Sequence, residues 1–180
     1  AIEIKPNYAE AYYNLGIILM DLGKLKEAEF SYRKAIELNP EYANAHNNLG
    51  GILRNQGKLK EAEFSYRKAI EIKPNYAEAH SNLGTILKDL RKLQEAELSY
   101  RKAIEINPNY AEAHSNLGII LKDLRKLQEA ELSTRKAIAI NPNLAVAHLN
   151  LGVILKDLGK LQEAELSYRK AIEIKPNYAE

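Results

Sequence analysis

Hydrophobic positions near the start of the chain recur about once per helical turn and separate into two groups. The first group consists of Ala11, Leu15, Ile18, Leu19 and Leu22. The second group consists of Leu25, Ala28, Tyr32, Ala35 and Ile36. Each group forms one apolar stripe on a helix. Since Gly23 lies between the groups and Pro40 follows the second, the pattern predicts two amphipathic helices joined by a tight turn.

The same pattern returns every 34 residues along the chain. The windows are Ala9–Tyr42, Ala43–Tyr76, Ala77–Tyr110, Ala111–Leu144 and Ala145–Tyr178, which we call repeats 1 to 5. Positions within a window are counted as places, starting from its first residue. Residues 1–8 are the tail of a preceding repeat, and residues 179–180 begin another. Because one small repeat cannot bury its own apolar stripes, we expect residues 1–180 to form a single stacked array.

Several residues recur at fixed places with little change. In repeat 3 they are Leu83, Gly84, Leu87, Ala96, Tyr100, Ala103 and Pro108. This combination of period and places resembles the tetratricopeptide repeat family. The resemblance implies an all-α fold, a right-handed α-solenoid superhelix of helix-turn-helix repeats whose first helices line a concave side. The chain begins and ends with AIEIKPNYAE, so we expect a fragment of a longer array, or an artificial array built from one.

Glycines mark two features of each repeat. The turn between the helices contains Gly23, Gly57 and Gly159 in three repeats, and Arg91 and Arg125 in the other two. If this turn is left-handed, arginine there is roughly 1 kcal/mol less favourable than glycine. A second glycine lies at place 8, inside the first helix, where glycine is unfavourable by about 1 kcal/mol. We expect it to allow close approach of the alanine at place 20 on the second helix.

Two other local predictions concern helix starts and the packed tyrosine at place 24. Asn75 with Glu78, and Asn109 with Glu112, have the spacing of a capping box at the start of the first helix. Asn7 with Glu10 repeats this spacing in repeat 1. Thr134 replaces the tyrosine found at place 24 of the other repeats. A void or a water molecule is expected beside it, making the junction of repeats 4 and 5 the softest.

Composition and charge exclude several classes of function. Hydrophobic residues make up 46% and charged residues 28% of the chain, and the formal net charge is +2. This balance argues against a nucleic-acid or membrane partner held by bulk electrostatics. The absence of cysteine excludes disulfides, thiol nucleophiles and thiolate metal sites. We expect no membrane-spanning segment and no cofactor, and we favour a cytoplasmic location.

The histidines do not indicate catalysis or metal binding. They are His46, His80, His114 and His148, all at place 4. Equivalent residues of stacked repeats lie roughly 10 Å apart, too far to share one metal ion. A nucleophile pair of His80 and Ser81 is excluded because adjacent helical residues point in different directions. Place 4 is typically aromatic in the family, so we expect packing roles and no enzymatic activity.

The most informative column is place 6, which is asparagine in every complete repeat. Its members are Asn14, Asn48, Asn82, Asn116 and Asn150. A carboxamide has donors and an acceptor, so a column of them can pair with the backbone of an extended peptide whatever its side chains. The column resembles the asparagine ladder of O-linked N-acetylglucosamine transferase, which implies the same peptide-holding role. The alternative is that near-identical repeats simply repeat an asparagine bonded to water or a neighbouring helix.

Two charged columns accompany the asparagines, at places 12 and 13. The basic one contains Arg54, Lys88, Lys122 and Lys156. The acidic one contains Asp21, Asp89, Asp123 and Asp157. Neighbouring acids and bases suit a mixed polar peptide better than a polyphosphate, although they would equally form a self-neutralised solvated rim. Clamping of a terminal carboxylate is disfavoured because places 2 and 5 contain no lysine.

Three classes of function remain, all of them non-catalytic for this segment. The leading prediction is a protein–protein interaction scaffold that binds an extended peptide or a partner helix in the groove. The second is the substrate-recruiting array of a larger glycosyl- or sulfotransferase. The third is head-to-tail self-association through exposed repeat ends. RNA recognition is a weaker fourth, because the asparagine column is uniform. Differences between repeats, the best guide to specificity, concentrate at Tyr13, Met20, Asn47, Gly51, Arg54, Asn55, Val146, Leu149 and Val153.

Overall fold

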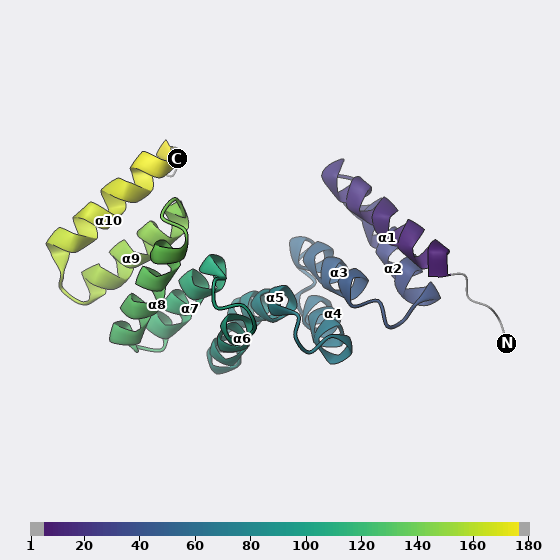
Figure 1. The fold of residues 1–180 in the computed structure, drawn as a ribbon, viewed down its shortest axis with the longest axis horizontal. Coiled ribbons are helices and arrows are strands. Elements are labelled where there is room, and N and C mark those ends of the chain that lie inside the picture. The colour runs from purple at the N-terminus through teal and green to yellow at the C-terminus, as the bar shows by residue number, and fades with distance from the viewer. Residues whose placement is uncertain (1–5, 177–180) are drawn as a thin grey trace. The chain divides into compact units, whose positions relative to one another are not determined.

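The structure is a computed structural model that describes residues 6–176, with side chains from Tyr8 onward. These residues form ten α-helices and no strand, in two compact units that divide at residue 90. The N-terminal unit contains α1 (Pro6–Asp21), α2 (Leu25–Leu38), α3 (Ala43–Asn55), α4 (Leu59–Ile72) and α5 (Ala77–Asp89). The C-terminal unit contains α6 (Leu93–Ile106), α7 (Ala111–Asp123), α8 (Leu127–Ile140), α9 (Ala145–Asp157) and α10 (Leu161–Ile174). The predicted all-α class and the two helices per repeat are confirmed (Figure 1).

In the N-terminal unit, each helix packs against the next one in the chain. Figure 1 shows the hairpin of α1 and α2 and that of α3 and α4, and α5 packs against both α4 and α3. Ala28, Tyr32 and Leu53 are fully buried at these contacts, whereas much of the apolar stripe predicted for α1 is exposed. Each large side chain buried in this way contributes roughly 1.5–3 kcal/mol. Tertiary packing of the stripes therefore stabilises helices that are individually short.

The C-terminal unit repeats this packing. Helices α7 and α8 form one hairpin and α9 and α10 another, while α6 packs against α7 and α8 against α9. The first helices α7 and α9 also contact each other. Ile120, Leu121, Ile154 and Leu155 are fully buried between these elements. In this unit the first helices α7 and α9 therefore contribute most of the fully buried side chains.

The turns between paired helices are left-handed, as the glycines predicted. Gly23 has a φ of 71°, and Gly57 and Gly159 each have a φ of 75°. Arg91 and Arg125 adopt the same conformation, with φ of 62° and 63°. A side chain with a Cβ is strained there, so each arginine turn is destabilised by roughly 1 kcal/mol relative to glycine.

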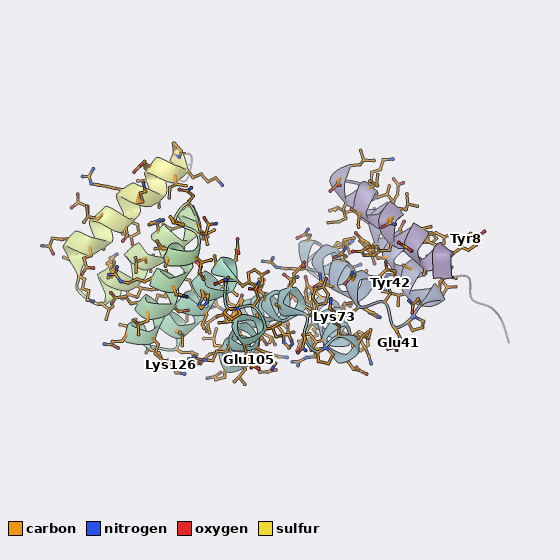
Figure 2. The ribbon with its side chains drawn as sticks, in the orientation of Figure 1. Tyr8, Glu41, Tyr42, Lys73, Glu105 and Lys126 are labelled. Atoms are coloured by element: carbon orange, nitrogen blue, oxygen red, sulfur yellow. The ribbon has the colours of Figure 1, made fainter. Side chains whose placement is uncertain are left out.

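The predicted asparagine caps are wrong. The residues that precede α5 and α7 are Tyr76 and Tyr110, and neither helix has a side-chain cap. Asparagine acts one turn earlier instead, where Oδ1 of Asn107 accepts a hydrogen bond from the backbone N–H of Asn109 at 3.2 Å. This side-chain-to-backbone contact shapes the loop between repeats. The corresponding pair in repeat 1 includes Asn7, whose side chain lies outside the described ones, which begin with Tyr8 (Figure 2).

The glycine at place 8 makes room mainly for the tyrosine at place 24. A Cβ added to Gly50 would lie 2.8 Å from Cε1 of Tyr66, and one added to Gly152 would lie 2.6 Å from Cε1 of Tyr168. Backbone approach to the place 20 alanine, as predicted, occurs in repeat 4, where a Cβ on Gly118 would lie 3.2 Å from the carbonyl oxygen of Ala130. The ring is therefore the main reason for this glycine.

Thr134 fills the tyrosine position of repeat 4 in a different way. It is fully buried, and its hydroxyl donates a hydrogen bond of 2.9 Å to the carbonyl oxygen of Ala130. A buried hydroxyl bonded in this manner needs no water molecule to satisfy it. The predicted softness of the junction between repeats 4 and 5 stays a prediction.

Candidate functional site

The asparagines at place 6 lie on the first helices of the repeats, and their exposure decreases along the chain. Asn14 on α1 is exposed, Asn48, Asn82 and Asn116 are half-buried, and Asn150 on α9 is buried. In each unit, we call the surface formed by its own first helices the first-helix face. A uniform sequence column therefore becomes a set of sites that differ in exposure.

Asn48, Asn82 and Asn150 each donate a hydrogen bond to place 5 of the preceding repeat. Nδ2 of Asn82 lies 3.0 Å from Oδ1 of Asn47, and Nδ2 of Asn150 lies 2.9 Å from Oγ of Ser115. The equivalent contact from Asn48 to the hydroxyl of Tyr13 is longer, at 3.4 Å. We call this contact the junction bond, because it joins the first helices of successive repeats. It confirms a neighbouring-helix partner for these amides, which the repeat pattern alone could not distinguish from a ligand.

The carboxylate of Glu78 determines which atom donates in the junction bond between Asn47 and Asn82. Nδ2 of Asn47 donates to Oε1 of Glu78 at 3.2 Å, and an ionised carboxylate can only accept. Oδ1 of Asn47 must therefore face Asn82, whose amide nitrogen donates to it. Asn82 thereby uses one of its two N–H groups, and its Oδ1 accepts no hydrogen bond within the described part of the chain.

The charged columns largely neutralise each other. Nε of Arg54 lies 3.4 Å from Oδ2 of Asp89, and Nζ of Lys88 lies 3.9 Å from the other oxygen of that carboxylate. In the C-terminal unit Nζ of Lys122 lies 3.1 Å from Oδ1 of Asp123. The remaining pair, Lys156 and Asp157, is exposed on α9. This arrangement favours the solvated-rim interpretation of places 12 and 13 over a site for a highly charged ligand.

A cavity of about 340 Å³ opens on the first-helix face of the N-terminal unit. Its lining consists of Ile17, Met20, Asp21, Tyr32, Asn47, Asn48, Gly51, Arg54, Asn55, Tyr66, Glu78 and Asn82. It thus brings together two of the predicted asparagines and five of the residues that distinguish repeats 1 and 2 from the others. Burial raises the pKa of the Tyr66 phenol to about 12, so the hydroxyl stays protonated and can donate a hydrogen bond.

The histidines hold the loops between repeats. Nε2 of His46, His80, His114 and His148 lies 2.8–3.0 Å from the carbonyl oxygen of Pro40, Pro74, Pro108 and Pro142, respectively. A carbonyl oxygen only accepts, so Nε2 carries the proton. No cluster of potential metal ligands occurs among the described residues. The expected structural role of place 4 is therefore a hydrogen bond as well as packing.

In each unit, the surface formed by its second helices, which we call the second-helix face, has a feature that was not predicted from the sequence. Place 22 exposes a large apolar side chain in every repeat, namely Phe30, Phe64, Leu98, Leu132 and Leu166. A groove of about 550 Å³ beside Phe64 and one of about 490 Å³ beside Leu132 are lined by equivalent residues of the two units. The sequence contained a signal for this surface, because every complete repeat has an apolar residue at place 22, directly after the glutamate at place 21.

Tetratricopeptide proteins of known structure share this fold. The chain is 28% identical to YrrB, described as a TPR protein with an unusual peptide-binding site, with a TM-score of 0.74 over 93% of this chain and 87% of that one. It is 25% identical to MamA, with a TM-score of 0.78 over 91% of this chain and 96% of that one. PilF of Pseudomonas aeruginosa, 24% identical, has a TM-score of 0.84 over 93% of this chain and 76% of its own.

No curated protein sequence matches the chain significantly. No helix among the described residues is both long and apolar enough to cross a bilayer. Related repeat profiles match residues 50–91, 31–64 and 99–131. Proteins with such repeats mediate protein–protein interactions and are generally non-enzymatic. Since the tetratricopeptide repeat profile matches residues 9–42, 77–110 and 145–178, more than half of the sequence, the chain belongs to the tetratricopeptide repeat family.

Proposed function

We propose that this chain is a non-catalytic interaction module that binds an extended peptide on the first-helix face, with the place 6 asparagines contacting the peptide backbone. The observation that carries the proposal is the cavity of about 340 Å³ that contains both Asn48 and Asn82. The likeness to YrrB, whose description includes a peptide-binding site, supports the same class of ligand. So does the resemblance of the asparagine column to a known peptide-holding ladder.

The junction bond would prepare the amide for this role. Because Asn82 is held through one N–H group by Asn47, its side chain is already oriented before a ligand arrives. The second N–H and Oδ1 then suffice to pair with one C=O and one N–H of a peptide backbone. Repeats about 10 Å apart would meet a strand rising about 3.3 Å per residue once every three residues. The side chains of the peptide would then be recognised by other pockets.

The test is binding to a random pool of extended peptides by the whole chain. We expect the parent to bind many sequences weakly, and a variant with Asn48→Ala and Asn82→Ala to lose them together. The matched control carries Phe64→Ala and Leu132→Ala on the second-helix face, and it should bind like the parent. Equal binding by the asparagine variant at unchanged helicity would refute the backbone-reading role. Loss of binding in the control alone would move the site to the other face.

Self-association is a second candidate, favoured by exposed apolar residues on the first and last helices. On α1 they are Leu15, Ile18 and Leu22, and on α10 they are Leu161 and Ile172. Surfaces of this kind stack head to tail in helical repeat arrays. A mass that rises with concentration in analytical ultracentrifugation would support it, and a strict monomer at high concentration would exclude it. Recruitment of substrates for a larger glycosyl- or sulfotransferase would use the same peptide-binding surface.

A further inference from the structure

Gly51 is a helix-interior glycine that neither the backbone nor the packing requires. A Cβ added there would meet only the hydroxyl oxygen of Tyr66, at 3.7 Å, which is ordinary contact. Its neighbour Gly50 is different, because a Cβ there would collide with the Tyr66 ring at 2.8 Å. Glycine inside a helix is unfavourable by about 1 kcal/mol relative to alanine. At Gly51 that loss is not offset by any contact within the chain.

The other repeats show what a side chain at this position does. Place 9 contains Ile17, Thr85, Ile119 and Val153 in repeats 1, 3, 4 and 5. Each of these is only partly buried, so place 9 lies on the open side of its first helix. In repeat 2 the missing side chain leaves space in the cavity next to Tyr66, while Ile17 and Met20 form its apolar wall. Gly51 therefore contributes open volume where the other repeats project a side chain.

The polar lining of the cavity has more negative than positive charge available to a ligand. Asp21 and Glu78 both line it, and both are exposed to solvent. The only guanidinium in the lining belongs to Arg54, which pairs with Asp89. Asp89 is also near Lys88, so this group of five comprises three acids and two bases. A positively charged group entering the cavity would meet a carboxylate without displacing an existing cation.

We propose that the cavity at Gly51 is a specificity pocket for a cationic side chain, arginine or lysine, of the bound peptide. This inference rests on the proposed peptide-binding function and adds a preferred ligand residue to it. The aliphatic part of the side chain packs against Ile17 and Met20, which suits long basic side chains with apolar stems. The charged head reaches Glu78 and the Oδ1 atom of Asn82, which both accept hydrogen bonds.

The experiment uses three pools of extended peptides that are random except at a central residue. That residue is arginine in the first pool, its neutral isostere citrulline in the second, and glutamate in the third. We expect the whole chain to bind the arginine pool on the order of tenfold more tightly than the citrulline pool, and the glutamate pool most weakly. Gly51→Ile, which copies repeats 1 and 4, should abolish this preference while the citrulline pool still binds.

A second variant tests the charge without filling the space. Glu78→Gln keeps an oxygen that can accept from Asn47, so the junction bond should survive while the preference for arginine over citrulline falls several-fold. Equal binding of the arginine and citrulline pools by the parent would overturn the pocket and leave the proposed function intact. So would an unchanged preference in both variants. Failure of all three pools to bind would overturn the peptide-binding function and the pocket together.

Discussion

Repeats 1 and 2 and repeats 4 and 5 have the same helices and turns but present different side chains at equivalent places. Gly51 and Asn47 of repeat 2 correspond to Val153 and Leu149 of repeat 5. Tyr32 of repeat 1 corresponds to Thr134 of repeat 4. These changes lie at places 5, 9 and 24, whereas the buried leucines, alanines and isoleucines are nearly constant. The comparison separates residues that maintain the array from residues that give each part of it a different surface.

The constant part of the comparison gives the largest expected effect. Gly50→Ala and Gly152→Ala should each destabilise the chain by about 2 kcal/mol, because the added methyl overlaps the ring of Tyr66 or Tyr168. Gly51→Ala is the matched control, and it should stabilise the chain by about 0.5–1 kcal/mol, since alanine is the better helix former and meets no obstacle. Urea titrations followed by circular dichroism would measure both. The same sign at residues 50 and 51 would contradict this account of place 8.

Exchanging the turn residues of repeats 2 and 4 should have a smaller effect on stability. Gly57→Arg in repeat 2 should destabilise by about 1 kcal/mol, and Arg125→Gly in repeat 4 should stabilise by a similar amount, because both positions are left-handed. The thermal unfolding midpoints of the two variants should therefore move in opposite directions. If Arg125→Gly leaves the midpoint unchanged, the arginine side chain must make a compensating contact, and the strain account would fail for that turn.

The ion pairs on the second helices should give the smallest effect. A hydrogen bond from Lys160, at 2.8 Å, and the nearby Arg135 lower the pKa of Glu131 despite its burial. Because the folded pKa lies below the ordinary value of 4.5, this carboxylate stabilises the fold above that pH and loses its contribution as the pH falls through the folded pKa. Its contribution should be under about 1 kcal/mol.

The measurement compares the parent and Glu131→Gln across pH. Their unfolding midpoints should differ most near neutral pH and converge in acid. Glu29 in repeat 1 is the control from the other region, since the neutral Gln56 amide donates to it at 2.7 Å and its nearby lysine, Lys58, lies farther away, at 3.9 Å. Added salt should therefore reduce the effect of Glu131→Gln more than that of Glu29→Gln. If the midpoint difference grew in acid, the pKa of Glu131 would be raised on folding, which would contradict the lowered pKa.

Sequence reasoning predicted the fold well because the information was local and repeated five times. Periodicity located both helices of each repeat, and glycine chemistry identified the left-handed turns even where Arg91 and Arg125 replace glycine. The caps failed because the helices begin after Tyr76 and Tyr110, and asparagine instead shapes the preceding loop. Neither the helix start nor the role of asparagine in the loop can be predicted without knowing the first residue of each helix.

The candidate site was only half predictable. The asparagine column could be read directly, and the residues that differ between repeats pointed to the region where the cavity lies. The junction bond could not be read, because Asn82 and Asn47 are far apart in sequence and their contact depends on the stacking of α3 and α5. The open space at Gly51 was equally hidden, since a helical glycine can serve packing, as Gly50 does, or leave a vacancy.

The junction bond also sets a rule for recombining such repeats. Place 6 is always asparagine, whereas its acceptor at place 5 of the preceding repeat can be a phenol, an amide or a serine hydroxyl, as Tyr13, Asn47 and Ser115 show. Repeats with any of these acceptors should be interchangeable in a chimeric array. Repeat 5 has Leu149 at place 5, so it can follow another repeat but cannot precede one without removing the place 5 acceptor of the next asparagine. Shuffling in this array is therefore directional.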